Sequence, residues 1–148
     1  METEFLYVII PLLVGALTQL TKFAIFSYKH GIQWDYFFTH GHMPSTHSAF
    51  VSALIVTTGY YHGISSGAFL VAFSLSIIIF DDALRLRMYL GDQGRYLNNL
   101  VQSLEIDPKK FPRLKERVGH RTSEVIVGII YGIALSYLFI YFFSIFFK

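Results

Sequence analysis

Long apolar runs separated by short polar stretches dominate the pattern of hydrophobic and polar positions along this chain of 148 residues. In the first run, residues 5–28, the polar and charged side chains lie near the end: Thr18, Gln19, Thr21 and Lys22. About 20 residues of helix cross the hydrocarbon core of a bilayer, so this run is long enough to span it. Lys22 either extends to the membrane surface or reaches into a polar pocket.

The second run, residues 44–61, is short and rich in Ser, Ala, Thr and Gly. Small residues let helices approach closely in lipid, so we expect this helix to be packed inside a bundle. Residues 62–66 predict a tight turn. The third run begins near Gly67, and its uncharged part ends at Phe80, which is too short to span. We therefore expect the third helix to continue to about Leu90.

This continuation places four charged residues on the third helix: Asp81, Asp82, Arg85 and Arg87. Asp81 and Arg85 are four residues apart, in the order that favours a helical ion pair. Charged side chains at membrane depth face protein or water and commonly mark functional sites. The alternative is that the helix ends at the surface and that water solvates these charges.

Residues 91–119 are polar and basic, and Pro108 and Pro112 argue against continuous helix there. Within this stretch, residues 97–104 predict a short amphipathic piece lying on the membrane. Residues 121–147 predict a last, almost wholly apolar helix. It carries Gly128 and Gly132, a pair of small residues four apart, which we expect to serve packing within the chain.

The composition supports a membrane protein. Hydrophobic residues make up 53% of the chain and charged residues 15%, against about 25% charged in soluble domains; the mean hydropathy is +0.48. A net charge of +2 implies no general affinity for nucleic acid, and the lack of cysteine excludes thiolate chemistry. Residues 1–4 lack a basic region, so we expect the first run to be retained.

The sequence thus predicts a single all-α domain, residues 1–148. We expect an integral membrane bundle of about four transmembrane helices with a basic loop before the last one. Successive crossings place residues 30–43 and 91–119 on one side of the membrane, and both termini on the other. Of the twelve Lys and Arg, only Lys148 belongs clearly to the second side. The positive-inside rule therefore places the loops in the cytoplasm, for a protein of the cell inner membrane.

This topology gathers the polar residues near the cytoplasmic face, where residues 41–48 join two apolar runs. Pro44 suits the first turn of a helix. The free N–H groups of such a turn, with the hydroxyls of Ser45 and Thr46, can hold an anion, and His47 can exchange a proton near neutral pH. The alternative is a capped helix start with an uninvolved histidine.

A second motif lies before the last helix. His120 and Glu124 are four residues apart, on one face of a helix that starts there. A carboxylate that accepts from one imidazole nitrogen fixes the tautomer and raises the basicity of the other nitrogen. Alone this pair is weak evidence, because acidic residues are common in the first turn of helices.

Together, Lys22, residues 44–47 and residues 120–128 occur in the order seen in type 2 phosphatidic acid phosphatases and vanadium haloperoxidases. That superfamily has a Lys motif, a Pro-Ser-Gly-His motif and a motif ending His-x3-Asp. The chain resembles still more closely the small divergent branch of acid-phosphatase and vanadium-haloperoxidase-related proteins. That branch carries Gly-Met-Pro-Ser-Ser-His-Ser, resembled by residues 42–48. It also carries an Asp-Ala…Arg…Gly stretch and a Leu-Asn pair, resembled by Asp82-Ala83, Arg87, Gly91 and Leu97-Asn98.

The resemblance implies a role for each matching residue. His120 would attack phosphorus, Glu124 would hold its ring, and His47 would protonate the leaving oxygen. The phosphate group would be bound by a set of polar and charged residues: Lys22, Ser45, Thr46, Arg87, Arg85 and Asp82.

The sequence also departs from the superfamily pattern. An arginine six positions before the histidine is replaced by Leu114, so we expect Arg87 to bind phosphate, with Arg85, Arg117 and Arg121 as alternatives. Lys29-His30 stands where the first motif continues to Arg-Pro. Glu124 replaces Asp, and Thr46 replaces Gly or Ser.

The resulting hypothesis is a metal-independent membrane phosphatase, without cofactor, that acts on a lipid phosphate monoester entering from the bilayer. Phosphatidylglycerophosphate is our first candidate, because it is made on the inner leaflet. The alternatives are an inactive scaffold or regulator, an isoprenoid diphosphate phosphatase, a haloperoxidase, and a metal site at His40, His42 and His47. A homo-oligomer is left open, and no nucleic-acid partner is expected.

Overall fold

A computed structural model describes residues 5–34, 43–104, 107, 110–116, 118 and 121–146. These residues form the helices α1 (Leu6–His30), α2 (Thr46–His62), α3 (Gly67–Asp81), α4 (Arg87–Ser103) and α5 (Thr122–Phe146), and a π-helical turn, η2 (Asp82–Leu86), joins α3 to α4. The described part of the chain contains no strand. The all-α prediction is confirmed.

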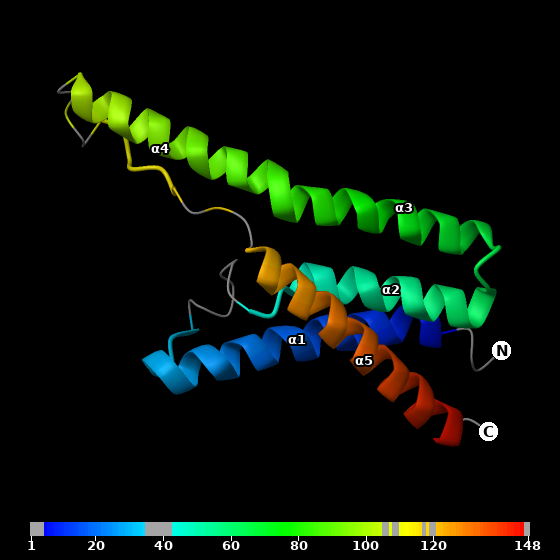
Figure 1. Cartoon of the computed structure of the whole chain (residues 1–148). Helices are drawn as coiled ribbons and strands as arrows, with labels where there is room; N and C mark the ends of the chain where they lie inside the picture. Colours follow the sequence, from blue (N-terminus) through cyan, green and yellow to red (C-terminus); the bar gives the residue numbers. More distant parts are fainter. Residues whose placement is uncertain are drawn as a thin grey trace.

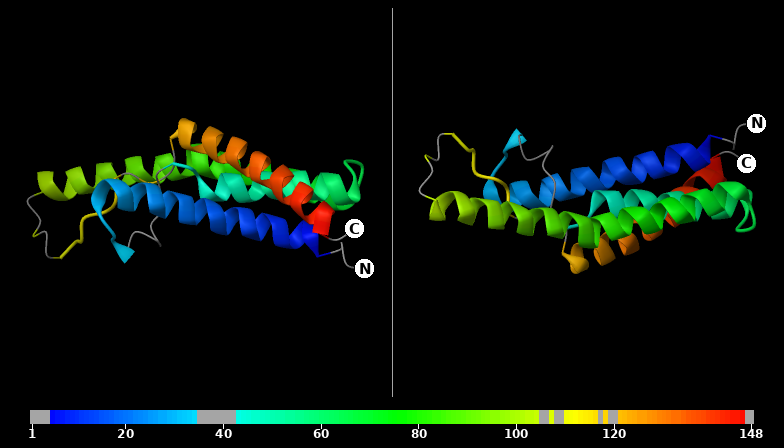
Figure 2. Two further views of the ribbon diagram at one scale, coloured as in Figure 1. Left: turned by 90° about the horizontal axis from the view of Figure 1, so that it is seen from below. Right: turned by 90° about the horizontal axis from the view of Figure 1, so that it is seen from above.

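Helix α2 occupies the centre of the bundle, between α3 on one side and α1 and α5 on the other (Figure 1). The helices α1, α2, the continuous α3–α4 and α5 run in alternating directions, so the start of α1 and the end of α5 lie at the same end of the bundle as the α2–α3 turn (Figures 1 and 2). Gly63, with a φ of +81°, and Ser66, which caps α3, form that turn, as predicted. The arrangement brings the starts of α2 and α5 to the same region.

Small residues line the contact between α2 and α5. A Cβ added at Gly128 would lie 2.6 Å from the backbone oxygen of Ser45, and one at Gly132 would collide with the backbone of Ala49. Several buried hydroxyls in the bundle, those of Thr18, Thr57, Ser76 and Ser136, donate to carbonyls one turn earlier. Close packing through small residues is typical of helices in lipid, and the predicted packing role of the glycine pair is confirmed.

Three helices among the described residues are long and apolar enough to cross a membrane: α1, the continuous helix Gly67–Ser103 and α5. Their outward faces carry large exposed apolar side chains, including Leu12, Leu70, Ile78 and Leu138. A soluble protein rarely exposes so much apolar surface, so these faces fit a lipid environment. With 17 residues, α2 is shorter than these three spans.

The predicted third helix is longer than expected. It continues through η2 to Ser103 and is 37 residues long. Residues 97–103 therefore end this helix and do not form a separate amphipathic piece, which corrects the prediction. Gly91 and Gly94 do not break the helix, because residues 114–116 and Val118 pack directly against them. In both views α4 extends past the starts of α2 and α5 (Figure 2).

Candidate functional site

The start of α2 is built around Ser45, whose side chain is fully buried. The Ser45 Oγ accepts hydrogen bonds from the Ser48 N–H at 3.4 Å and from the Ser48 hydroxyl at 2.9 Å. Ser45 is thus the N-cap, and Pro44 precedes the helix instead of lying in its first turn. This corrects the predicted helix start by two residues.

The two sequence motifs meet at this cap. The Ser45 N–H donates to the backbone oxygen of Glu124 at 3.1 Å. One turn further along α5, Gly128 lies so close that an added Cβ would be 3.0 Å from the Cβ of Ser48. The start of α2 and the first turn of α5 are therefore in direct contact, although some 80 residues of sequence separate them.

Helix α1 contributes two polar contacts to the same region. The Thr46 hydroxyl donates to the Gln19 Oε1 at 2.7 Å, and the hydroxyls of Thr21 and Tyr131 lie 2.8 Å apart. Gln19 was not predicted to have a role. The signal for it was its position three residues before Lys22, on the same face of the helix.

Lys22 follows Thr21 in α1 and is only 3% exposed. Its ammonium group is close enough to the carboxylate of Glu124 for an electrostatic interaction. Of the two alternatives for this lysine, the structure supports the polar pocket, because a side chain extending to the membrane surface would be exposed. An ammonium group buried in a bundle needs a partner to offset the loss of water.

Glu124 also holds the start of α5. Its Oε2 accepts from the Arg121 N–H at 3.2 Å, which is the carboxylate half of a capping box. His120 lies outside the described residues, as do His40, His42 and Arg117. The predicted contact between Glu124 and the His120 ring is therefore untested by the structure. Among the described residues, no three His, Asp or Glu side chains gather as metal ligands.

His47 occupies the second position of α2 and is exposed at the start of the helix. Thr46, beside it, is half-buried. The amide groups of this first turn, the neighbouring Lys22 and the imidazole of His47 are groups that favour an anion. The site can thus supply positive charge from α1 and α2.

The four charged residues of the third helix separate into two ion pairs. Asp81 and Arg85 pair at 3.4 Å, as their spacing predicts, but their side chains are 58% and 74% exposed. Asp82 and Arg87 pair at 2.7 Å and are 31% and 29% exposed. The π-helical turn aligns residues five apart, which explains why Asp82 meets Arg87.

Only the second pair is in a position to join the site. The η2 segment, which contains both Asp82 and Arg85, contacts α5, and Arg87 follows it directly. The Arg85 side chain is 74% exposed, whereas that of Arg87 is 29% exposed. Of these two arginines, the geometry therefore favours Arg87. A π-helical turn of this kind often occurs at functional sites.

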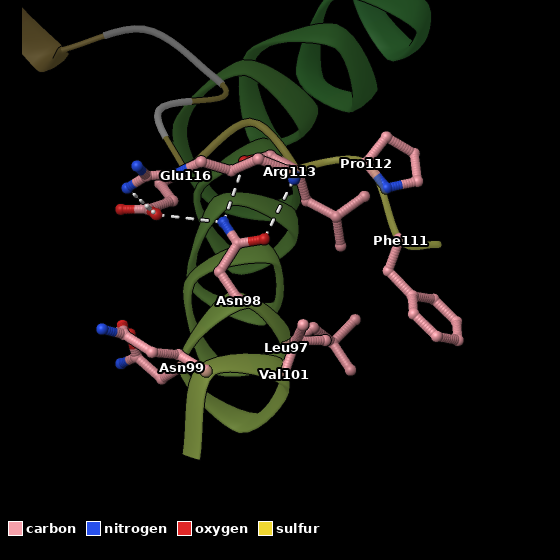
Figure 3. A pocket seen from close by; sticks show the side chains of 10 residues that line it. Leu97, Asn98, Asn99, Val101, Phe111, Pro112, Arg113 and Glu116 are labelled. Atoms are coloured by element: carbon pink, nitrogen blue, oxygen red, sulfur yellow. Dashed lines mark hydrogen bonds and ion pairs between the residues drawn. The ribbon is translucent and has the colours of Figure 1, made fainter. Parts of the chain in front are cut away.

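A hollow of about 700 Å³ lies between the last turns of α4 and residues 111–116 (Figure 3). Its lining includes Leu97, Asn98, Phe111 and Glu116. Hydrogen bonds from Arg113 and then from Asn98 lower the pKa of the Glu116 carboxyl from its usual range. Sequence reasoning assigned no function to this stretch.

Comparison with known proteins agrees with the resemblance in the motifs. A model of the divergent PAP2 family matches residues 4–135. The chain is also 34% identical, over 124 residues, to the uncharacterized membrane protein YuiD of Bacillus subtilis (strain 168). That match covers 76% of this chain and 78% of the relative. No solved structure gives a significant match.

Proposed function

Since the chain belongs to the divergent PAP2 family, we propose that it is a membrane-embedded phosphatase that hydrolyses a lipid phosphate monoester. The observations that carry this proposal are the burial of Lys22, which interacts electrostatically with Glu124, and the direct contact between Ser45 at the start of α2 and Glu124 in the first turn of α5. Phosphoryl transfer depends mainly on positioned positive charge and hydrogen-bond donors, and this region supplies both.

In the proposed reaction, a ring nitrogen of His120 forms a bond to phosphorus while the bond from phosphorus to the lipid oxygen breaks. His47 gives a proton to that oxygen. Water then attacks phosphorus, with His47 taking its proton, and the nitrogen–phosphorus bond breaks to release inorganic phosphate. Lys22 and Arg87 stabilise the charge on the phosphoryl oxygens, and Glu124 orients the ring of His120.

Two parts of the predicted phosphate cradle are engaged elsewhere. The Ser45 hydroxyl accepts from Ser48, and the Thr46 hydroxyl donates to Gln19. We therefore assign phosphate binding to the backbone N–H groups of the first turn, to Lys22 and to Arg87, with Ser45 and Thr46 holding that turn in place. This division accounts for the replacement of Gly or Ser by Thr at position 46.

We further propose that α2 completes a four-span bundle. Its 17 residues give a helix of about 26 Å, close to the 30 Å of the hydrocarbon core. The site then lies at the cytoplasmic face, where a lipid enters from the inner leaflet. Phosphatidylglycerophosphate fits this side better than an external isoprenoid diphosphate.

Phosphate release by the purified protein, from a panel of lipid phosphates in nanodiscs, tests this proposal. We expect release by the wild type and a loss of at least about 1,000-fold in His120→Ala, because the covalent route is removed. Equal rates for the two proteins would refute the mechanism. Isoprenoid diphosphates belong in the panel, since a preference for them would replace the monoester assignment.

A second candidate is a scaffold or regulator that has kept the fold and lost catalysis. The engagement of the Ser45 and Thr46 hydroxyls, and Leu114 in place of an arginine, favour this candidate. Vanadate distinguishes the two, because an intact phosphatase pocket binds it as a mimic of the phosphoryl group in transfer. We expect micromolar binding that Lys22→Met weakens; no binding by the folded wild type would favour the scaffold.

A further inference from the structure

One face of α4 is fitted to the chain segment that leads into α5. Gly91, Gly94 and Asn98 lie three and four residues apart and share this face. A Cβ at Gly91 would lie 2.7 Å from the backbone oxygen of Glu116, and one at Gly94 would lie 2.6 Å from that of Lys115. Only glycine permits this approach. We call these three residues, with residues 114–116 and Val118, the α4 seam.

Asn98 fastens the seam with its side-chain amide. Its Oδ1 accepts from the Leu114 N–H at 3.0 Å, and its Nδ2 donates to the Leu114 carbonyl at 3.0 Å. A single side chain thus satisfies both backbone groups of one residue outside any regular structure. Figure 3 shows the Asn98 amide directed at this segment, while Asn99 points away from it.

Glu116 adds a polar link beside Asn98. Its Oε1 accepts from the Asn98 Nδ2 at 3.0 Å and from the Arg113 Nη2 at 2.9 Å. The lowered pKa of Glu116 agrees with a carboxylate that is held by two donors. The seam therefore combines close backbone packing with a network of hydrogen bonds among Asn98, Arg113, Leu114 and Glu116. Such a network holds the segment in one conformation.

The seam ends three residues before Arg121, the N-terminal neighbour of α5, in the sequence. An added Cβ at Gly91 would lie 3.2 Å from the backbone nitrogen of Val118. Three residues later, the Arg121 N–H is held by Glu124. His120 stands between these two anchored points in the sequence. Fixing both sides of a short stretch removes conformational freedom that would otherwise be lost when substrate binds.

We propose that Asn98, with Gly91 and Gly94, is a positioning residue that holds the entry to α5 and thereby aligns residue 120 with Lys22 and the start of α2. This inference rests on the proposed phosphatase function. Asn98 takes no part in the chemistry itself. Its replacement slows the chemical step, because an error of about 1 Å in the position of a reacting group costs about 100-fold.

The test compares Asn98→Ala with Asn99→Ala, and Gly94→Ala with Gly67→Ala, in full-length protein in nanodiscs. Nothing lies within 4 Å of a Cβ added at Gly67, so this variant controls for the loss of glycine alone. We expect kcat to fall about 10- to 100-fold in the two seam variants, with KM changed by less than about threefold. The two control variants should keep wild-type values.

Trypsin gives a readout that does not depend on activity, since Arg113 and Lys115 both lie in the segment. Cleavage after them should be at least about tenfold faster in Asn98→Ala than in Asn99→Ala, because cleavage follows opening of the segment. Circular dichroism checks that both variants keep their helices.

The outcomes separate the two proposals. If the wild type is active and Asn98→Ala keeps its kcat, the positioning role is refuted although the phosphatase stands. If the wild type releases no phosphate, the proposed function fails and the positioning role fails with it. In that case faster cleavage of Asn98→Ala shows that the seam is only structural, and unchanged cleavage shows that Asn98 does not hold the segment.

Discussion

Lys22 and Lys29 lie two helical turns apart on α1 and have opposite surroundings. Lys22 is 3% exposed and interacts with Glu124, whereas Lys29 is exposed in the last turn of the helix. Burial of an ammonium group costs several kcal/mol unless nearby charges and dipoles compensate. The sequence left the position of Lys22 open, because a long side chain near a helix end can reach either protein or the membrane surface.

We expect Lys22→Met to lower phosphate release by at least about 100-fold, because methionine fills the space of the lysine chain but carries no charge for the phosphoryl oxygens. Lys29→Met is the matched control and should stay within about twofold of the wild type, since exposed charges contribute little. Initial rates on the preferred lipid phosphate measure both. Full activity in a folded Lys22→Met protein would exclude Lys22 from the site.

The two arginines of the third helix, Arg85 and Arg87, permit a second comparison of single residues. Arg87→Lys should lower phosphate release by about tenfold or more, because an ammonium group cannot reproduce the paired contacts of a guanidinium. Arg85→Lys should leave it unchanged, because the Arg85 side chain is 74% exposed. Equal effects on the rate constants of both variants would contradict the assignment of Arg87.

The helices themselves follow from the sequence, apart from the end of the third one, because long apolar runs specify them. The close packing of α2 on α5 also follows, from the spacing of Gly128 and Gly132. The π-helical turn does not, because one extra residue per turn leaves no mark on composition or hydropathy. The length of α4 was also missed. Glycines such as Gly91 and Gly94 weaken a helix, and the sequence does not show that another part of the chain packs on them.

For the packing of helices, we predict that Gly132→Ala destabilises the protein by about 1–3 kcal/mol, because the new Cβ would displace the backbone of Ala49. Gly67→Ala, where the surroundings are open, should leave stability unchanged or raise it slightly. Thermal unfolding in detergent measures the difference. Equal midpoints for the two variants would contradict the α2–α5 contact, while loss of a dimer without a change in midpoint would point to a contact between chains.

For the whole molecule, the antiparallel order of helices places the α2–α3 turn and segment 110–116 at opposite ends of the bundle (Figure 1). From the sequence, Lys22, Ser45 and Glu124 could be predicted only to lie near the same face of the membrane. Which side chains touch within that layer depends on helix rotation, which the sequence does not specify when helices are apolar on all sides.

The chain contains no cysteine, so single cysteines report topology without background. We expect Ser65→Cys, in the α2–α3 turn, to react with a membrane-impermeant maleimide in intact cells. Lys110→Cys should react only after the membrane is opened, because the positive-inside rule places its basic segment in the cytoplasm. The reverse pattern would move the site to the outer face and favour an external substrate.

A structure of the protein with bound vanadate tests the central claim most directly. The account predicts vanadate within hydrogen-bond reach of Lys22 and the first turn of α2, with a ring nitrogen of His120 at the vanadium atom. Vanadate bound away from α2 and α5, or a His120 ring directed away from it, would contradict the claim that these helices form a phosphate site.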